Sequence, residues 1–156
     1  MQKTSPRVNA SGPSLTLTRI FNAPRALVFA AWTQPMHMKP WAAPHGFTIS
    51  DSEGEIRPGG HWRSCMVNPD GEKLWLRGVY REIRPVELLS FTHIWEEDDG
   101  TPENETLVTI QFEDLGDKTK MTFTQQFFAS VESRDGHKGG WTQCFEKLDT
   151  FLATLK

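Results

Sequence analysis

Between His45 and Phe128 the sequence alternates apolar and polar residues in short runs, and turn sequences separate the runs. Alternation with a period of two is typical of strands that bury only one face. Short turns join strands that lie side by side and run in opposite directions. The region therefore predicts a meander of about six antiparallel strands. The expected turns are 57–60, 68–71, 84–87 and 115–117, and an exposed acidic loop is expected over Glu96–Glu105.

The segment before this meander has a mixed pattern. Ser14–Phe21 alternates and predicts a first strand. Pro24–Trp32 has the apolar spacing of a short amphipathic helix. A second helical turn is expected around Met36 and Trp41. The chain should thus form one strand and two short helices before the meander begins.

A long helix is predicted at the carboxyl end. Its apolar residues recur at intervals of three and four, and they are Trp141, Phe145, Leu148, Leu152 and Leu155. Gly136, Gly139 and Gly140 each disfavour a helix by about 1 kcal/mol relative to alanine. The helix therefore begins either at Gly139–Gly140 or near Ser130, in which case packing must hold its first turns.

A sheet with one apolar face needs a cover, and the terminal helix is the only predicted element long enough to supply it. The sequence thus predicts the α+β class: a curved antiparallel sheet of about six to seven strands, two short helices, and a long C-terminal helix over a pocket. At 156 residues the chain is the size of one domain. Residues 14–156 are expected to form it, and residues 1–13, which are almost without apolar side chains, a flexible lead-in.

Aromatic residues are frequent, with six Trp and ten Phe against a single Tyr. A buried indole N–H needs a hydrogen-bond partner, so this many tryptophans are seldom needed only to fill a core. Two interpretations remain open, a bulky, well-filled core and a pocket lined by rings. The residues expected to contact a ligand in such a pocket are Trp32, Trp41, Trp62, Met66, Phe91, His93, Trp95, Ile110, Phe123, Gln125, Trp141 and Phe145.

Two polar residues lie on these inward-facing positions. His93 shares a strand face with Phe91 and Trp95, where it could orient a ligand or act as an acid or base. The alternative is a buried neutral histidine that is hydrogen-bonded to a neighbour. Gln125 lies on the face of Met121, Phe123 and Phe127, so its amide needs a partner that is either a ligand or another residue.

Charge and motifs exclude several classes of function. The net charge of −3 argues against nucleic-acid binding. Met1–Ser14 is polar, so neither a secretory signal nor membrane insertion is expected, and the chain is predicted to be cytoplasmic. Cys65 and Cys144 should then stay reduced and behave as small apolar residues. Neither an HExxH helix nor a CxxC pair is present, so no metal and no cofactor is predicted.

Seven segments carry a family resemblance, and they are Arg19–Pro24, Val28–Trp32, Gly59–Met66, Gly78–Ile83, Thr106–Ile110, Thr119–Thr122 and His137–Trp141. In this order and spacing they closely resemble the helix-grip superfamily, which includes START-like lipid-transfer domains and birch-pollen-allergen-like proteins. Within it the chain is most similar to the family related to the carboxy-terminal domain of the activator of heat-shock protein 90 ATPase. The resemblance covers about residues 14–156.

The resemblance implies a pocket between sheet and long helix that binds a lipophilic or aromatic small molecule, as a stand-alone bacterial-type member would. It also implies an alternative, a module that binds a protein partner such as a chaperone, with Glu96–Glu105 and Trp75 as contact points. The activator itself has a further amino-terminal domain, and the residues before Ser14 are too few to form one, which favours the small molecule. A cyclase- or hydrolase-like enzyme ranks third, because no acid–base pair can be named. Either a monomer or a homodimer is compatible with the sequence.

Overall fold

The structure is a computed structural model that describes residues 8–155, apart from the side chain of Pro35. Its elements, in chain order, are β1 (Leu15–Phe21), α1 (Arg25–Thr33), α2 (Pro35–Met38), β2 (Thr48–Gly54), β3 (His61–Val67), β4 (Lys73–Arg84), β5 (Leu88–Glu96), β6 (Pro102–Asp114), β7 (Thr119–Gln126) and α3 (Val131–Thr154). This is the order of strands and helices that the sequence predicts.

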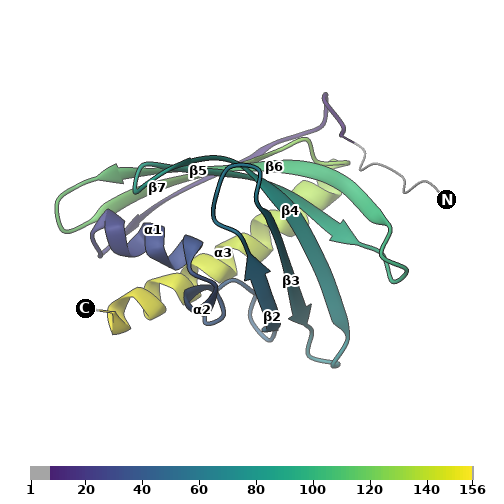
Figure 1. The fold of residues 1–156 in the computed structure, drawn as a ribbon, viewed down its shortest axis with the longest axis horizontal. Coiled ribbons are helices and arrows are strands. Elements are labelled where there is room, and N and C mark those ends of the chain that lie inside the picture. The colour runs from purple at the N-terminus through teal and green to yellow at the C-terminus, as the bar shows by residue number, and fades with distance from the viewer. Residues whose placement is uncertain (1–7, 156) are drawn as a thin grey trace.

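The seven strands form one antiparallel sheet in the order β1-β7-β6-β5-β4-β3-β2. Strands β2 to β7 are the predicted meander, and β1 pairs with β7 along its whole length. Figure 1 shows the sheet curving around α3, with α1 and α2 on the same, concave side. The main hydrophobic core joins residues of the sheet to residues of α1 and α3. The predicted fold class is confirmed.

Helix α3 is continuous through its three glycines, so the longer of the two predicted helices is the one that forms. The Ser133 N–H donates to the Ser130 hydroxyl at 3.1 Å, which caps the first turn. Glu132 lies in that turn, where a negative charge stabilises the amino end of a helix. The His137 ring also packs on Phe128, with centroids 5.0 Å apart. Capping and packing together offset the low helix propensity of the glycines.

The prediction that Phe127 continues the inward face of β7 is wrong. Strand β7 ends at Gln126, and Phe127 has a φ of 72°. This left-handed backbone breaks the alternation, so Phe128 takes the buried position instead and is 0% exposed. The Asn104 side chain donates to the Phe127 carbonyl at 2.8 Å and helps to hold this conformation.

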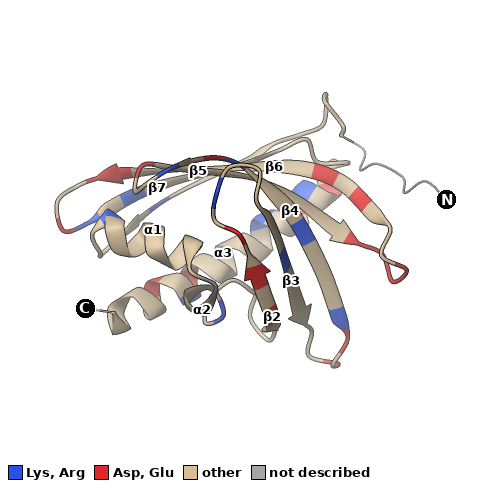
Figure 2. Ribbon diagram, viewed as in Figure 1, with Lys and Arg blue, Asp and Glu red and all other residues tan. Residues whose placement is uncertain are grey.

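The predicted exposed loop Glu96–Glu105 is also wrong over half of its length. Glu96 is the last residue of β5 and pairs with Pro102 at the start of β6, which leaves only residues 97–101 outside the strands. The Glu96 side chain is 3% exposed, because Arg63 donates two hydrogen bonds to its carboxylate at 2.9 and 3.0 Å. These bonds and the nearby Arg77 lower the pKa of Glu96. Figure 2 shows the remaining acidic turn between β5 and β6 in red.

Residues 1–7 of the expected lead-in lie outside the described residues. Of the rest, Asn9 donates from its side chain to the Phe128 carbonyl at 3.1 Å. The Phe128 N–H in turn donates to the Pro13 carbonyl at 3.1 Å. The segment before β1 is therefore bonded to the segment between β7 and α3.

Both cysteines are buried free thiols, as the sequence predicts. Within residues 8–155, none of the helices combines the length and the apolar character that a membrane crossing requires.

Gly78 permits a close packing of three strands. Its neighbour across the β3–β4 pair is Trp62, whose indole N–H donates to the Thr92 carbonyl on β5 at 3.2 Å. A Cβ atom at residue 78 would lie 1.9 Å from that carbonyl oxygen and 2.5 Å from the indole nitrogen. Only glycine lets the indole reach across β4 in this way.

We expect Gly78→Ala to lower the free energy of unfolding by about 1–3 kcal/mol, the usual cost of overpacking a well-filled interior. Urea unfolding followed by tryptophan fluorescence measures this change. The matched control is Gly139→Ala, because a Cβ at residue 139 meets nothing within 4 Å. It should raise the stability by up to about 1 kcal/mol through helix propensity. A shift of the same sign in both variants would contradict the role of Gly78.

Candidate functional site

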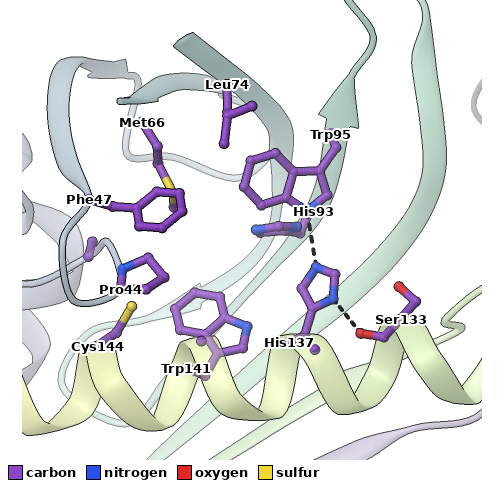
Figure 3. Close-up of a pocket in the computed structure, with 13 residues that line it drawn as sticks. Pro44, Phe47, Met66, Leu74, His93, Trp95, Ser133, His137, Trp141 and Cys144 are labelled. Atoms are coloured by element: carbon purple, nitrogen blue, oxygen red, sulfur yellow. Dashed lines mark hydrogen bonds between the residues drawn. The ribbon is translucent and has the colours of Figure 1, made fainter. Parts of the chain in front are cut away.

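A pocket of about 390 Å³ lies between the first half of α3 and the strands β3 to β5, and we call it the outer pocket. Figure 3 shows its lining residues around a common space. The lining residues are Ala42, Pro44, Phe47, Met66, Leu74, His93, Trp95, Ser133, Gly136, His137, Gly140, Trp141 and Cys144. None of them is an Asp, Glu, Lys or Arg, so the outer pocket is apolar apart from two imidazoles, a hydroxyl and a thiol.

A second, much smaller cavity of about 50 Å³ lies between α1 and the strands β2 to β5, and we call it the inner cavity. Trp32, Trp62 and Phe91 are among its lining residues. It shares Ala42, His93 and Trp141 with the outer pocket. His93 and Trp141 are therefore side chains that lie between the two spaces.

The twelve predicted ligand-binding residues divide into three groups. Met66, His93, Trp95 and Trp141 line the outer pocket. Trp32, Trp62 and Phe91 line the inner cavity alone. The other five line neither space and are buried in the main core, and they are Trp41, Ile110, Phe123, Gln125 and Phe145.

The reason for this division is that α3 touches the sheet closely at only one end of the pocket. The Phe123 ring lies 4.7 Å from the Trp141 ring and 5.4 Å from the Phe145 ring, centroid to centroid. These rings fill the interior there. Towards its amino end α3 faces the outer pocket instead, with Gly136 and Gly140 on that side. Both sequence interpretations thus hold, each for a different part of the molecule.

Several pocket residues were not predicted. His137 lies four residues before Trp141 on α3, and Cys144 lies three residues after it. Gly140 is three residues after His137 and four before Cys144, so the helical spacing could have found all three. Pro44 and Phe47 belong to the irregular segment between α2 and β2, which carries no periodic signal.

The tryptophan N–H groups at the pocket are satisfied inside the protein. Trp95 donates to His137 Nε2 at 3.0 Å, and Trp141 donates to Gln125 Oε1 at 2.8 Å. Trp62 donates to the Thr92 carbonyl, as described above. The indoles therefore offer a ligand their faces and edges but no free donor.

Gln125 is the centre of a buried hydrogen-bond chain that joins α3 to three strands. Its carbonyl oxygen accepts from Trp141, and its amide nitrogen donates to the Thr106 hydroxyl at 2.8 Å. Thr106 then donates to the backbone carbonyl of His93 at 2.9 Å. The sequence left two partners open for this amide, a ligand and another residue. The structure supplies other residues of the chain.

His137 is held as a neutral imidazole (Figure 3). Its Nε2 accepts the Trp95 N–H, so the ring proton is on Nδ1, which donates to the Ser133 carbonyl at 2.7 Å. Burial lowers the pKa of His137. With both nitrogens occupied, this residue is a wall of the outer pocket rather than a group that can bind a ligand.

His93 differs, because its ring has no hydrogen bond to any other described residue. The residue is only 3% exposed, and its ring lies among those of Trp62, Trp95, His137 and Trp141 at centroid distances of 5.6 to 6.0 Å. Burial, and then the nearby His137, lowers the pKa of His93 to about 3. The buried neutral histidine considered for this position is present, but it lacks the expected protein partner.

Within residues 8–155, no three or more His, Cys, Asp or Glu side chains are grouped so that they could hold a metal ion. The polar groups that line the outer pocket without a hydrogen bond to another side chain that the structure describes are the His93 imidazole, the Ser133 hydroxyl and the Cys144 thiol.

Residues 22–153 match the family described as Activator of Hsp90 ATPase homolog 1-like protein. Among curated proteins, none matches this chain.

Solved structures of similar proteins share the fold. The AHSA1 protein from Silicibacter pomeroyi is 25% identical, with a TM-score of 0.84 over 92% of this chain and 100% of that one. A protein from Rhizobium leguminosarum is 27% identical, with a TM-score of 0.77 over 91% of this chain and 95% of its own. A protein from Arthrobacter aurescens is 24% identical, with a TM-score of 0.84 over 98% of this chain and 93% of its own.

The pKa of His93 predicts a pH dependence of stability. Its value falls from 6.5 in the unfolded chain to about 3 in the fold. Below pH 6.5 the unfolded state therefore binds a proton that the folded state does not. Folding stability should fall from pH 6.5 towards pH 3, with a contribution from His93 that approaches about 1.4 kcal/mol per pH unit.

His93→Phe removes this contribution, so the variant should lose less stability than the wild type between pH 7 and pH 4. Urea unfolding at several pH values measures both slopes, and the comparison cancels the carboxylates that the two proteins share. Equal slopes of unfolding free energy against pH in the two proteins would contradict a buried His93 ring that stays unprotonated in the fold.

Proposed function

We propose that this chain, which belongs to the family of Activator of Hsp90 ATPase homolog 1-like proteins, binds an apolar small molecule in its outer pocket. The membership confirms the resemblance found in the sequence. The observation that carries the proposal is a space of about 390 Å³ whose lining is almost entirely apolar. Pockets that bind small molecules are typically about 300–1,000 Å³ in volume, with a few polar groups among apolar walls.

The rings around the space support an aromatic or lipophilic ligand. Phe47, Trp95 and Trp141 surround it in Figure 3, and Met66 adds an adaptable thioether. Aromatic side chains give a flat ligand large contact areas at low entropic cost, and edge or stacked contacts add about 0.5–1.5 kcal/mol each. The two free thiols suit a cytoplasmic setting, where thiols stay reduced.

The two histidines favour binding over catalysis, because only one of their rings is free to interact with a ligand. The rings of His93 and His137 are 6.0 Å apart, close enough to suggest an acid–base pair. Both nitrogens of His137 are engaged with Trp95 and Ser133. This leaves one imidazole, which suits recognition of a ligand better than proton transfer between two groups.

Binding of a chaperone-type partner is a second candidate, and the family description is the observation that favours it. The contact surface expected from the sequence is smaller in the structure. Glu96 is buried, and Trp75 is half-buried with the Arg63 guanidinium 3.9 Å from the centre of its ring. The exposed part is the acidic turn 97–101. A pull-down with the Hsp90 homologue of the same cell, combined with an ATPase assay, separates this candidate from the first.

The outer pocket can be filled without disturbing the fold, because Gly136 lines it and a Cβ there meets nothing within 4 Å. We expect Gly136→Leu to weaken the binding of a neutral fluorescent apolar probe, N-phenyl-1-naphthylamine, by about tenfold or more, which is about 1.4 kcal/mol. The new side chain would occupy the space that the probe needs. Probe fluorescence titrated with protein measures the affinity.

Gly139→Leu is the matched control. Residue 139 is on the same helix and equally open, but it does not line the outer pocket. Both variants should gain helix stability, by up to about 1 kcal/mol. The control should bind the probe as the wild type does. Equal loss or equal retention of binding in the two variants would place the probe elsewhere and overturn the proposal.

A further inference from the structure

We propose that the outer pocket selects neutral ligands that carry one hydrogen-bonding group, such as a phenolic hydroxyl, and that His93 is the residue that recognises this group. The inference rests on the proposed function and names the class of ligand for the same site. It follows from two separate properties of the pocket, which are the unpaired ring of His93 and the lack of charged side chains around it.

The first property is a polar ring that faces both spaces and has no hydrogen bond to another residue that the structure describes. His93 is 3% exposed and lines both the outer pocket and the inner cavity, yet its ring has no hydrogen bond to another described residue. A ring nitrogen that lines the pocket without a protein partner is open to a hydrogen bond from a guest. A ligand that supplies the partner gains this bond. A ligand without a polar group does not.

The other polar groups at the pocket are less suited to this role. The indole N–H groups of Trp95 and Trp141 and both nitrogens of His137 are already engaged. Ser133 is only half-buried, near the amino end of α3, so its hydroxyl is less sheltered from solvent than the His93 ring. His93 is the deeply buried group, and a neutral imidazole offers one donor and one acceptor. A hydroxyl group, which also donates and accepts, complements it.

The second property is the absence of compensating charge. The titratable groups around His93 come from four elements. On α3, His137 is neutral, and burial raises the pKa of the Cys144 thiol to about 12. On β4, burial raises the pKa of Tyr80, which lines the inner cavity, to about 12. Glu53 of β2 is exposed at the edge of the inner cavity, and Glu103 of β6 acts on His137.

None of the neutral groups can balance an ion in the outer pocket, and the two carboxylates do not line it. An ionised ligand would give up its hydration without gaining an opposite charge, which weakens its binding. A carboxylate is therefore disfavoured because no Arg or Lys lines the pocket. An ammonium group is disfavoured because no Asp or Glu does.

A series of four ligands on one ring system tests both properties at pH 7. Naphthalene is the apolar reference, 2-naphthol adds a neutral hydroxyl, 2-naphthoate adds a carboxylate, and 2-naphthylmethylamine adds an ammonium group. Quenching of the pocket tryptophans, or calorimetry, gives the affinities. We expect 2-naphthol to bind roughly two- to tenfold more tightly than naphthalene, the usual net worth of one hydrogen bond. Both ions should bind about tenfold or more weakly than naphthalene.

His93→Phe and His93→Leu identify the recognising residue. In each variant the affinity ratio of 2-naphthol to naphthalene should fall to about one, while naphthalene itself still binds. A residue with a merely structural role would weaken both ligands alike. Two variants of different shape guard against a local packing defect in either one.

The outcomes separate the two proposals. If neither naphthalene nor 2-naphthol binds the wild type, both proposals are overturned. If naphthalene binds but 2-naphthol binds no better, or an ion binds as tightly as 2-naphthol, only the inference about ligand class fails. It also fails if the preference for 2-naphthol survives in both His93 variants.

Discussion

The geometry of this molecule depends on a chain of three hydrogen bonds, two of them buried and one partly buried. It runs from the Trp141 indole to the Gln125 amide, then to the Thr106 hydroxyl, and ends at the backbone carbonyl of His93. Each polar group in it is satisfied, so its burial stabilises the fold, and low surrounding polarity strengthens every bond. The chain fixes the middle of α3 above β5, β6 and β7. It also fixes the backbone from which the His93 ring projects and the orientation of the Trp141 ring that forms the opposite wall.

From that fixed point the two directions along α3 differ. Towards the carboxyl end, Phe145, Leu148 and Leu152 are at most 2% exposed and fill the space under the sheet. Towards the amino end the helix carries glycines on the side that faces the pocket, and β3 and β4 curve away from it. The apolar layer between α3 and the sheet is thus closely packed at one end and contains a pocket at the other, within a few turns of the helix. At Gly78 the β4–β5 register has no residue pair, and the Thr92 carbonyl accepts the Trp62 indole N–H, for which Gly78 leaves room.

Much of the fold could be predicted from periodicity, because a residue's place on a strand or helix face depends on its neighbours in sequence. This is how Met66, His93, Trp95 and Trp141 were assigned to one space. Periodicity cannot show how far apart the faces of two elements lie. Phe123 and Gln125 point into the interior as predicted, but the sequence could not show that they pack in the core and do not line the pocket. Periodicity also fails where the backbone leaves the regular pattern. Phe127, with its positive φ, and the ion pair of Arg63 with Glu96 depend on long-range contacts that no local pattern records.

The three glycines of α3 have a consequence for how the pocket can be reached. They lower the local stability of the front of the helix by about 1 kcal/mol each relative to alanine. The strands of the sheet, in contrast, are held by antiparallel backbone pairing, with register shifts only in the β2–β3, β4–β5 and β5–β6 pairs. Transient fraying of a structure occurs first where backbone stability is least. The amino end of α3 should therefore open more readily than the sheet, and such an opening would widen the access to His93 while the rest of the molecule remains folded.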